Sequence, residues 1–238
     1  MPHVPWNPVI AVFFVVALYF VAPVVGALLL YPFRNVIHDD VTSQFLFVLL
    51  AEALTVAGLV LFLREYKKPL SFIGLKRPRL SDVGRGLLAY PLYFICFAII
   101  AVVATQFLPG LDTDQQQQLG FDNVQGALPL ILTFISLVVL PPLVEEIVVR
   151  GFLFGSLRKY LKWGSAALLT SLIFAAAHLP EGGDAGPLYI AALDTFVLSL
   201  VLCWLREKTG SLWAGITLHA VKNGIAYLTL YTSLFTFR

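Results

Sequence analysis

Charged residues are scarce in this sequence. They make up 13% of its 238 residues, whereas hydrophobic residues make up 59%. Soluble domains carry about 25% charged residues, and a soluble core of this length cannot bury so much apolar surface. The composition therefore excludes an ordinary soluble domain and indicates a multi-pass integral membrane protein.

Cysteine is nearly absent as well. Cys96 and Cys203 are the only two cysteines, and neither belongs to a paired spacing, which excludes a disulfide framework and a cysteine-based metal site. Both lie in apolar stretches and are expected to be buried free thiols. The sequence also lacks an internal repeat, and its first apolar run lacks the basic segment that precedes a signal-peptide core. We expect one transmembrane domain over residues 1–238, with an uncleaved first helix.

Long apolar runs are abundant in the chain. A helix that spans the hydrocarbon core needs about 20 mainly apolar residues. Seven stretches qualify, namely Val9–Leu30, Val41–Leu63, Gly86–Phe107, Ala127–Val149 and some residues beyond it, Gly164–Leu179, Leu188–Leu205, and Leu212 to about Phe235. Because the last stretch could form two shorter pieces, we expect an all-α, polytopic transmembrane helix bundle of seven or eight spans.

Basic residues are confined to alternate connections between these spans. They occur within 64–85, 158–162 and 206–208, whereas the opposite connections are acidic or nearly neutral. The positive-inside rule places the basic connections in the cytoplasm, so the N-terminus lies inside and, with seven spans, the C-terminus lies outside. We interpret segment 64–85 as a topology determinant near lipid headgroups. Membrane lipid is therefore an expected partner and nucleic acid is not.

A few polar residues lie at membrane depth, where each charged group costs about 2.5–3.5 kcal/mol on insertion scales. They are Glu52, Glu145, Glu146, Arg150, His178, Asp194, His219, Lys222 and the neutral Asn223. We measured depth from the basic ends of the helices with ~1.5 Å of rise per residue. Both adjacent glutamates, both histidines and Asn223 then fall between the middle third and the outer half of the bilayer. Residues that converge on one depth predict a site.

Helical phase separates the roles of the two adjacent glutamates. Glu146 and Arg150 are four residues apart and share a helix face, so we predict an internal ion pair. Glu145 lies about 100° around the helix from Glu146 and lacks that partner, so it is free to act. His219 and Asn223 also share a face.

Four further side chains are assigned supporting positions. Asp194 and Lys222 both lie about 18 Å from the basic ends of their helices, so we predict a structural ion pair between them. We expect Phe174 to pack beside the ring of His178, four residues later. Glu52 is interpreted as a structural carboxyl that bonds a neighbouring helix.

A carboxylate and two histidines that converge on a wet cavity suit the activation of water. Glutamate or histidine can accept the proton of water, and His219 with Asn223 can donate hydrogen bonds to a developing oxyanion. Two imidazoles and a carboxylate can also bind zinc. The sequence has no HExxH motif and no Gly-x-Ser-x-Gly motif, which disfavours a zincin and a serine hydrolase.

Three motifs together carry a resemblance to a known family. Glu145-Glu146-x-x-x-Arg150, Phe174-x-x-x-His178 and His219-x-x-x-Asn223 occur in this order on successive apolar helices. This set resembles the CPBP family of CAAX prenyl proteases and bacteriocin-processing enzymes, also called Abi, over about 128–226. The segments Phe72–Leu75 and Thr209–Trp213 are also similar to those of the family. The resemblance places the catalytic core at about 127–230, after the N-terminal helices at 9–107.

The resemblance implies an intramembrane endopeptidase. It implies that Glu145 and His178 activate water, that His219 and Asn223 bind the oxyanion, and that Glu146 and Arg150 support them. The family is often described as metalloproteases, and we leave open whether zinc held by Glu145, His178 and His219 takes part. The expected substrate is a peptide or a membrane-anchored protein, and the expected location is a prokaryotic cell membrane.

Two other interpretations stay open at this point. The chain could be a member of the same family that does not cleave peptides and acts in immunity or partner binding. Alternatively, its intramembrane carboxylates and histidines could form the relay of a proton-coupled transporter. The absence of repeat halves with paired broken helices disfavours transport.

Overall fold

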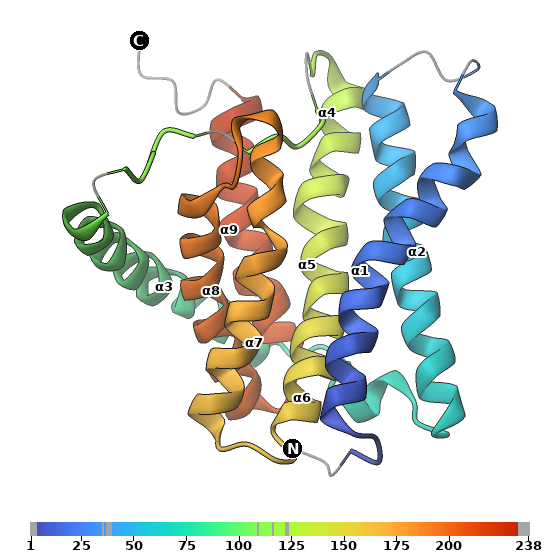
Figure 1. The fold of residues 1–238 in the computed structure, drawn as a ribbon, viewed down its shortest axis with the longest axis vertical. Helices are drawn as coiled ribbons and strands as arrows, with labels where there is room; N and C mark the ends of the chain where they lie inside the picture. The colour runs from blue at the N-terminus through green and yellow to red at the C-terminus, as the bar shows by residue number, and fades with distance from the viewer. Residues whose placement is uncertain are drawn as a thin grey trace.

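The computed structural model describes residues 4–34, 36, 40–108, 110–115, 117–121 and 124–232. Within these ranges every regular element is helical and no strand occurs. Six of the helices are long and apolar enough to cross a membrane. The predicted all-α fold is therefore confirmed, and the six apolar helices indicate a multi-pass membrane protein. Figure 1 shows the helices standing roughly side by side, with α3 tilted away from the others.

The N-terminal part consists of three long helices. These are α1 (Pro8–Leu30), α2 (Asp40–Glu65) and α3 (Leu80–Phe107). Asn7 caps α1, because its side chain accepts a hydrogen bond from the backbone N–H of Val9 at 2.8 Å,. Helix α1 packs against α2, whereas α3 packs against α8 and α9 at the other side of the bundle.

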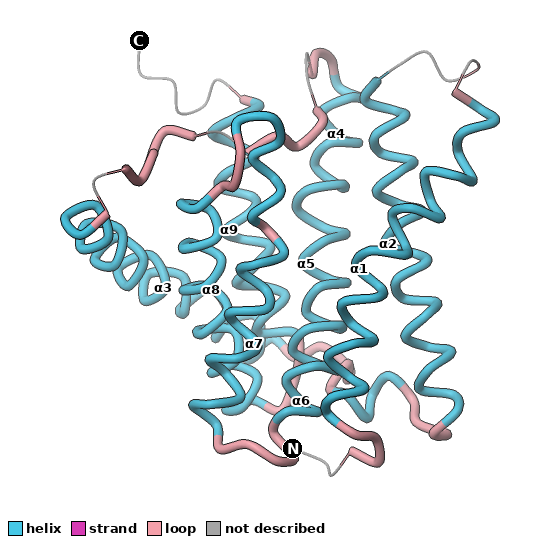
Figure 2. The backbone as a smooth tube through the Cα atoms, viewed as in Figure 1, coloured by secondary structure: helices cyan, strands magenta, loops and turns pink. Residues whose placement is uncertain are grey.

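The helix that carries the two adjacent glutamates is not a regular α-helix. It runs through α4 (Ala127–Phe134), α5 (Leu140–Glu145) and α6 (Phe154–Leu157), and π-helical segments at Ile135–Val139 and Glu146–Leu153 join these three. Figure 2 shows one continuous helical path through these elements. Pro141 and Pro142 lie inside it, and proline removes a backbone donor from a helix. The apolar run beginning at Ala127 thus continues to Leu157.

The C-terminal part contains α7 (Trp163–Ala177), α8 (Tyr189–Thr209) and α9 (Trp213–Tyr231). Short 3-10 turns lie at Tyr31–Phe33, Leu70–Ile73 and Leu179–Ala185. Helix α9 corresponds to the seventh predicted span but is not among the six helices that qualify by length and apolarity. The polar side chains of His219, Lys222 and Asn223 lie on this helix, and they lower its mean hydropathy.

The basic connections gather at one end of the bundle. The α2–α3, α6–α7 and α8–α9 connections all lie at the lower end in Figure 1, where α1 also begins. The described residues of the connections that follow α1, α3 and α7 lie at the upper end. This arrangement matches the alternation of charge in the sequence.

The lower end is held by the buried Arg206. Its Nη2 donates a hydrogen bond to the backbone oxygen of Ile73 at 2.8 Å, and its Nε donates to the backbone oxygen of Arg150 at 3.4 Å. Gly74 has a φ of 104°, and a Cβ at that position would overlap the Arg206 guanidinium. The backbone N–H of Leu212 donates to Gly74 O at 3.1 Å. The segments Phe72–Leu75 and Thr209–Trp213 therefore pack together beneath the glutamate helix.

Candidate functional site

The predicted catalytic residues surround one cavity inside the bundle. This central cavity has a volume of about 670 Å³. Glu145, His178, His219 and Asn223 line it from three different helical segments, and Glu52 and Lys222 line it as well. Residues that are separated by up to 78 positions (Glu145 to Asn223) thus meet at one place, as their common depth predicted.

Glu146 and Arg150 form the predicted ion pair. Arg150 Nη1 lies 2.9 Å from Glu146 Oε1, and the two side chains are 0% and 1% exposed. The Arg150 guanidinium also lies over the ring of Phe174, 4.3 Å from its centroid. Such a desolvated cation–π contact adds about 2 kcal/mol. The pair satisfies two charges in a dry interior and supports the site without lining the cavity.

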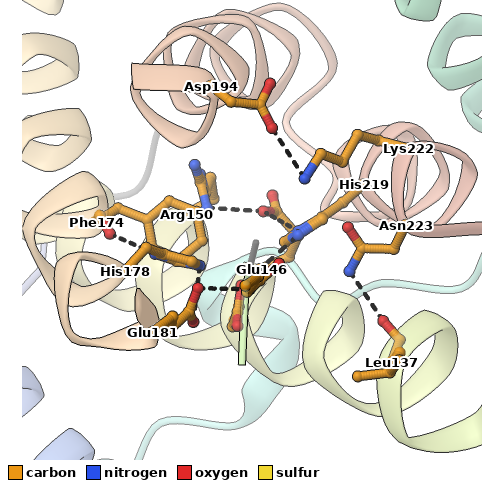
Figure 3. Close-up of polar contacts among 12 residues, drawn as sticks. Leu137, Glu146, Arg150, Phe174, His178, Glu181, Asp194, His219, Lys222 and Asn223 are labelled. Atoms are coloured by element: carbon orange, nitrogen blue, oxygen red, sulfur yellow. Dashed lines mark hydrogen bonds and ion pairs between the residues drawn. The ribbon is translucent and has the colours of Figure 1, made fainter. Parts of the chain in front are cut away.

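His219 lies between the two adjacent glutamates. Its Nε2 is 3.7 Å from Glu145 Oε2, and its Nδ1 is 3.5 Å from Glu146 Oε1. Figure 3 shows the His219 ring beside Glu146, close to Arg150. Gly215 makes this approach possible, because a Cβ there would lie 2.5 Å from Glu146 Oε2. Both glutamates therefore act on one histidine, which the helical-phase argument did not predict.

His178 occupies the C-terminal end of α7. Its Nδ1 lies 2.8 Å from the backbone oxygen of Phe174, so in the neutral ring Nδ1 carries the proton and donates. The Nε2 atom is then the acceptor, and it lies 3.9 Å from Glu181 Oε1. The rings of Phe174 and His178 meet edge to face with centroids 4.7 Å apart, which confirms the predicted packing. No ionic contact within 4.0 Å joins His178 to Glu145 in the described part of the chain.

The side chain of Asn223 bonds a backbone carbonyl, Leu137 O, that has no N–H partner within its own helix. Pro141 has no N–H to offer Leu137 O, four residues earlier. The side-chain Nδ2 of Asn223 donates to this oxygen at 2.9 Å instead. Because an amide nitrogen has two N–H groups, the second one is available to a ligand in the cavity.

The three residues proposed as zinc ligands do not converge. No group of three histidine, cysteine, aspartate or glutamate side chains is close enough to hold a metal ion in the described ranges. The two His178 nitrogens face Phe174 O and Glu181, while Glu145 faces His219. This geometry does not fit a metal held by Glu145, His178 and His219.

The predicted ion pair between Asp194 and Lys222 is also present. Lys222 Nζ lies 3.0 Å from Asp194 Oδ2, and Tyr93 Oη donates a hydrogen bond to Asp194 Oδ1. This contact ties α3 and α8 to α9 beside the cavity. Glu52 lines the cavity from α2, and no hydrogen bond or ion pair to it is found among the described residues. The interpretation of Glu52 as a carboxyl bonded to a neighbouring helix is therefore not supported.

The residues at the rim of the site were not predicted from the sequence. Glu181 was assigned only to an acidic connection, yet it faces His178 and accepts a hydrogen bond from Gln117 Nε2 at 2.5 Å. The backbone N–H of Gln118 also donates to Glu181 O at 2.8 Å. The only sequence signal was that Glu181 follows His178 by three residues, one helical turn.

Comparison with known proteins finds one matching family model and several distant relatives. Residues 127–225 match the family model described as type II CAAX prenyl endopeptidase Rce1-like. The chain is 24% identical to the membrane-embedded CAAX protease MroQ of Staphylococcus aureus (strain USA300) over 205 residues, which is 83% of this chain and 78% of MroQ. It is 24% identical to UPF0177 protein YxdF of Lactococcus lactis subsp. lactis (strain IL1403), over 58% of this chain and 70% of YxdF.

A third relative is an uncharacterized 24.3 kDa protein of Escherichia coli, which is 28% identical over 58% of this chain and 57% of that protein. No solved structure matches the chain. The matched residues contain all three motifs and the whole set of predicted site residues. Residues 127–225 are thus similar to the Rce1-like CAAX endopeptidase family, and one of the matching relatives is a membrane-embedded CAAX protease.

Proposed function

We propose that this protein is an intramembrane endopeptidase that hydrolyses a peptide bond inside the central cavity. The observation that carries the proposal is that Glu145, His178, His219 and Asn223 line one cavity. The match of residues 127–225 to a family of endopeptidases supports proteolytic chemistry. The bacterial relatives support a location in a prokaryotic cell membrane.

In the proposed reaction, water is activated between Glu145 and His178. The carboxylate or the unprotonated Nε2 of His178 accepts a proton from water, and the resulting hydroxide attacks the carbonyl carbon of the scissile bond. The accepted proton then passes to the leaving nitrogen as the C–N bond breaks. Because Glu145 is 16% exposed and lines the cavity, it can reach both water and substrate.

The oxyanion is assigned to His219 and Asn223. Their donors come from one face of α9, and preorganised donors are worth about 2.7–4 kcal/mol each in acyl-transfer sites. Glu146 Oε1 lies 3.5 Å from His219 Nδ1 and positions this ring. Arg150 in turn holds Glu146 through the ion pair at 2.9 Å. No step is assigned to a metal, because the three candidate ligands do not fit one.

Helix α9 is proposed as the seventh membrane crossing. It has 19 residues, which span about 28 Å at ~1.5 Å per residue, close to the ~30 Å hydrocarbon core. It packs against α3 and α8, so neighbouring helices shield its polar residues from lipid. This assignment places the catalytic side chains of α9 at the depth of Glu145.

The proposal is tested by comparing peptides from membrane fractions that contain the wild type, Glu145→Ala or Glu65→Ala. Glu65 lies exposed at the end of α2, remote from the cavity, and serves as the matched control. Mass spectrometry should show products in the wild type and the Glu65→Ala fraction that are absent from the Glu145→Ala fraction. Identical peptides in all three fractions, with all three proteins folded, would instead favour a binding role.

A further inference from the structure

A second cavity adjoins the central one at the upper end of the bundle. This outer vestibule has a volume of about 560 Å³ and lies between α1 and α2. Its polar lining includes Arg34, Asp40 and Ser43. Gln44 and Phe47 line both cavities, so the two spaces meet at these side chains.

The rim of both cavities is built from the upper connections. Gln117, Gln118 and Glu181 line the central cavity, and Gly120 lines the outer vestibule. Gln44 Nε2 donates to Leu119 O at 3.2 Å, which attaches the α3–α4 connection to α2. No residue of the lower connections 66–79, 158–162 or 210–212 lines either cavity.

The charge of the connections assigns the two ends of the bundle to opposite sides of the membrane. The lower connections carry the excess of lysine and arginine. The upper end carries an excess of carboxylates, in Asp40 at the start of α2 and in Asp112, Asp114, Glu181 and Asp184 of the connections. Under the positive-inside rule the lower end is cytoplasmic. The vestibule and the rim therefore face away from the cytoplasm.

We propose that the site is reached from the non-cytoplasmic side, through the outer vestibule and past Gln44 and Phe47. Given the proposed endopeptidase function, its substrate is an extended polypeptide segment located outside the cytoplasm. A cytoplasmic C-terminal segment would have to approach from the basic end, where neither cavity has a lining residue. The chain thus differs in substrate side from a protease of cytoplasmic prenylated proteins.

The proposal is tested by thiol labelling of the full chain in intact cells, with Cys96 and Cys203 replaced by alanine. Four single cysteines are introduced into this background, namely Ser43→Cys in the vestibule, Val48→Cys in the central cavity, Gln118→Cys at the rim, and Lys208→Cys at the basic end. Gln118 and Lys208 are exposed, and no hydrogen bond to either side chain is found among the described residues, so both substitutions should be tolerated. The probe is a charged methanethiosulfonate that does not cross membranes, and the readout is the loss of free thiol.

Ser43→Cys, Val48→Cys and Gln118→Cys should lose their free thiol in intact cells, whereas Lys208→Cys should react only after the cells are opened. The reverse pattern would overturn the proposal. The proposal is also overturned if Val48→Cys reacts only in opened cells. It is overturned as well if Val48→Cys reacts in neither intact nor opened cells while Gln118→Cys does react. If Val48→Cys fails to fold, Ser43→Cys, a nearly isosteric change, still reports the vestibule. Thiol labelling does not depend on peptide cleavage. If the Glu145→Ala membrane fraction gave the same peptides as the wild type, that result would count against the proposed endopeptidase function and not against access from the non-cytoplasmic side.

Discussion

Glu146 Oε1 lies 2.9 Å from Arg150 Nη1, and the same oxygen lies 3.5 Å from His219 Nδ1. One carboxylate oxygen therefore neutralises a buried guanidinium and also positions a histidine that lines the cavity. Because the Arg150 side chain is 0% exposed, neither charge can turn to water when its partner is lost.

Removing one partner of this pair should destabilise the protein strongly. We expect Arg150→Met to lower the free energy of unfolding by about 3–5 kcal/mol, because it leaves an uncompensated buried carboxylate. Thermal unfolding in detergent measures the effect. Arg158→Met is the matched control, since Arg158 pairs with Glu207 at 2.8 Å but the two side chains are 23% and 29% exposed. That change should lower the free energy of unfolding by about 0–1 kcal/mol. Equal losses for both variants would contradict the prediction that breaking the buried ion pair costs more than breaking the exposed one.

A methyl group on Gly215 should impair cleavage more than a methyl group on Gly224 of the same helix. A Cβ at Gly215 would lie 2.5 Å from Glu146 Oε2, whereas one at Gly224 would make an ordinary contact of 3.6 Å with Val138. Gly215→Ala must therefore displace Glu146 from His219, and we expect the rate to fall by about tenfold, or ~1.4 kcal/mol of transition-state stabilisation. Initial cleavage rates of both folded variants check this, and equal rates would refute it.

Cleavage should weaken in mild acid if His178 accepts a proton. The neutral ring is required, and the reference pKa of histidine is about 6.5. Once the pH is below the pKa of the His178 ring, the protonated fraction dominates, so the rate should fall about tenfold for each further pH unit. A pH–rate profile between about pH 5 and 8 provides the measurement. A flat profile down to pH 5 would remove His178 from this role.

Glu181→Gln tests whether His178 causes this fall in rate at low pH, which we call the acid limb of the profile. The Glu181 carboxylate lies 3.9 Å from His178 Nε2, and its negative charge favours the protonated ring. The substitution should move the acid limb to lower pH, because the charge is lost while the size of the side chain is kept. An unchanged limb would mean that another group titrates.

The half-buried contact between Asp194 and Lys222 should behave as a coupled pair. Asp194→Asn should destabilise the protein because Lys222 then lacks its anion at 3.0 Å. Adding Lys222→Met should restore part of the loss, with a coupling energy of about 0.5–3 kcal/mol. A double-mutant cycle of unfolding free energies measures this, and strict additivity would show that the two side chains do not interact.

Local rules predicted several contacts correctly. The i, i+4 spacing gave the Glu146–Arg150 pair and the Phe174–His178 packing, because side chains four residues apart share a helix face. Depth along the membrane normal gave the Asp194–Lys222 pair, because charges buried at the same level in a bundle must find one another.

Contacts that depend on chain packing could not be predicted in this way. The bond between Asn223 and Leu137 O crosses 86 positions, and it forms only where α9 passes the carbonyl that Pro141 leaves free. The π-helical segment Glu146–Leu153 also alters the phase of the glutamate helix, so an angle based on 3.6 residues per turn did not show that both glutamates reach His219.

The sequence by itself determined the all-α membrane class, the alternation of charge between the two ends, and the identity of the motif residues. The class and the charge alternation follow from composition and periodicity, which are local properties of the chain, and the motif residues follow from the resemblance to a known family. Only the tertiary structure decided that His219 lies between Glu145 and Glu146, that Glu181 faces His178, and that the cavity is rimmed by the acidic connections. Those relationships depend on how separate helices and loops pack, which no spacing along the chain specifies.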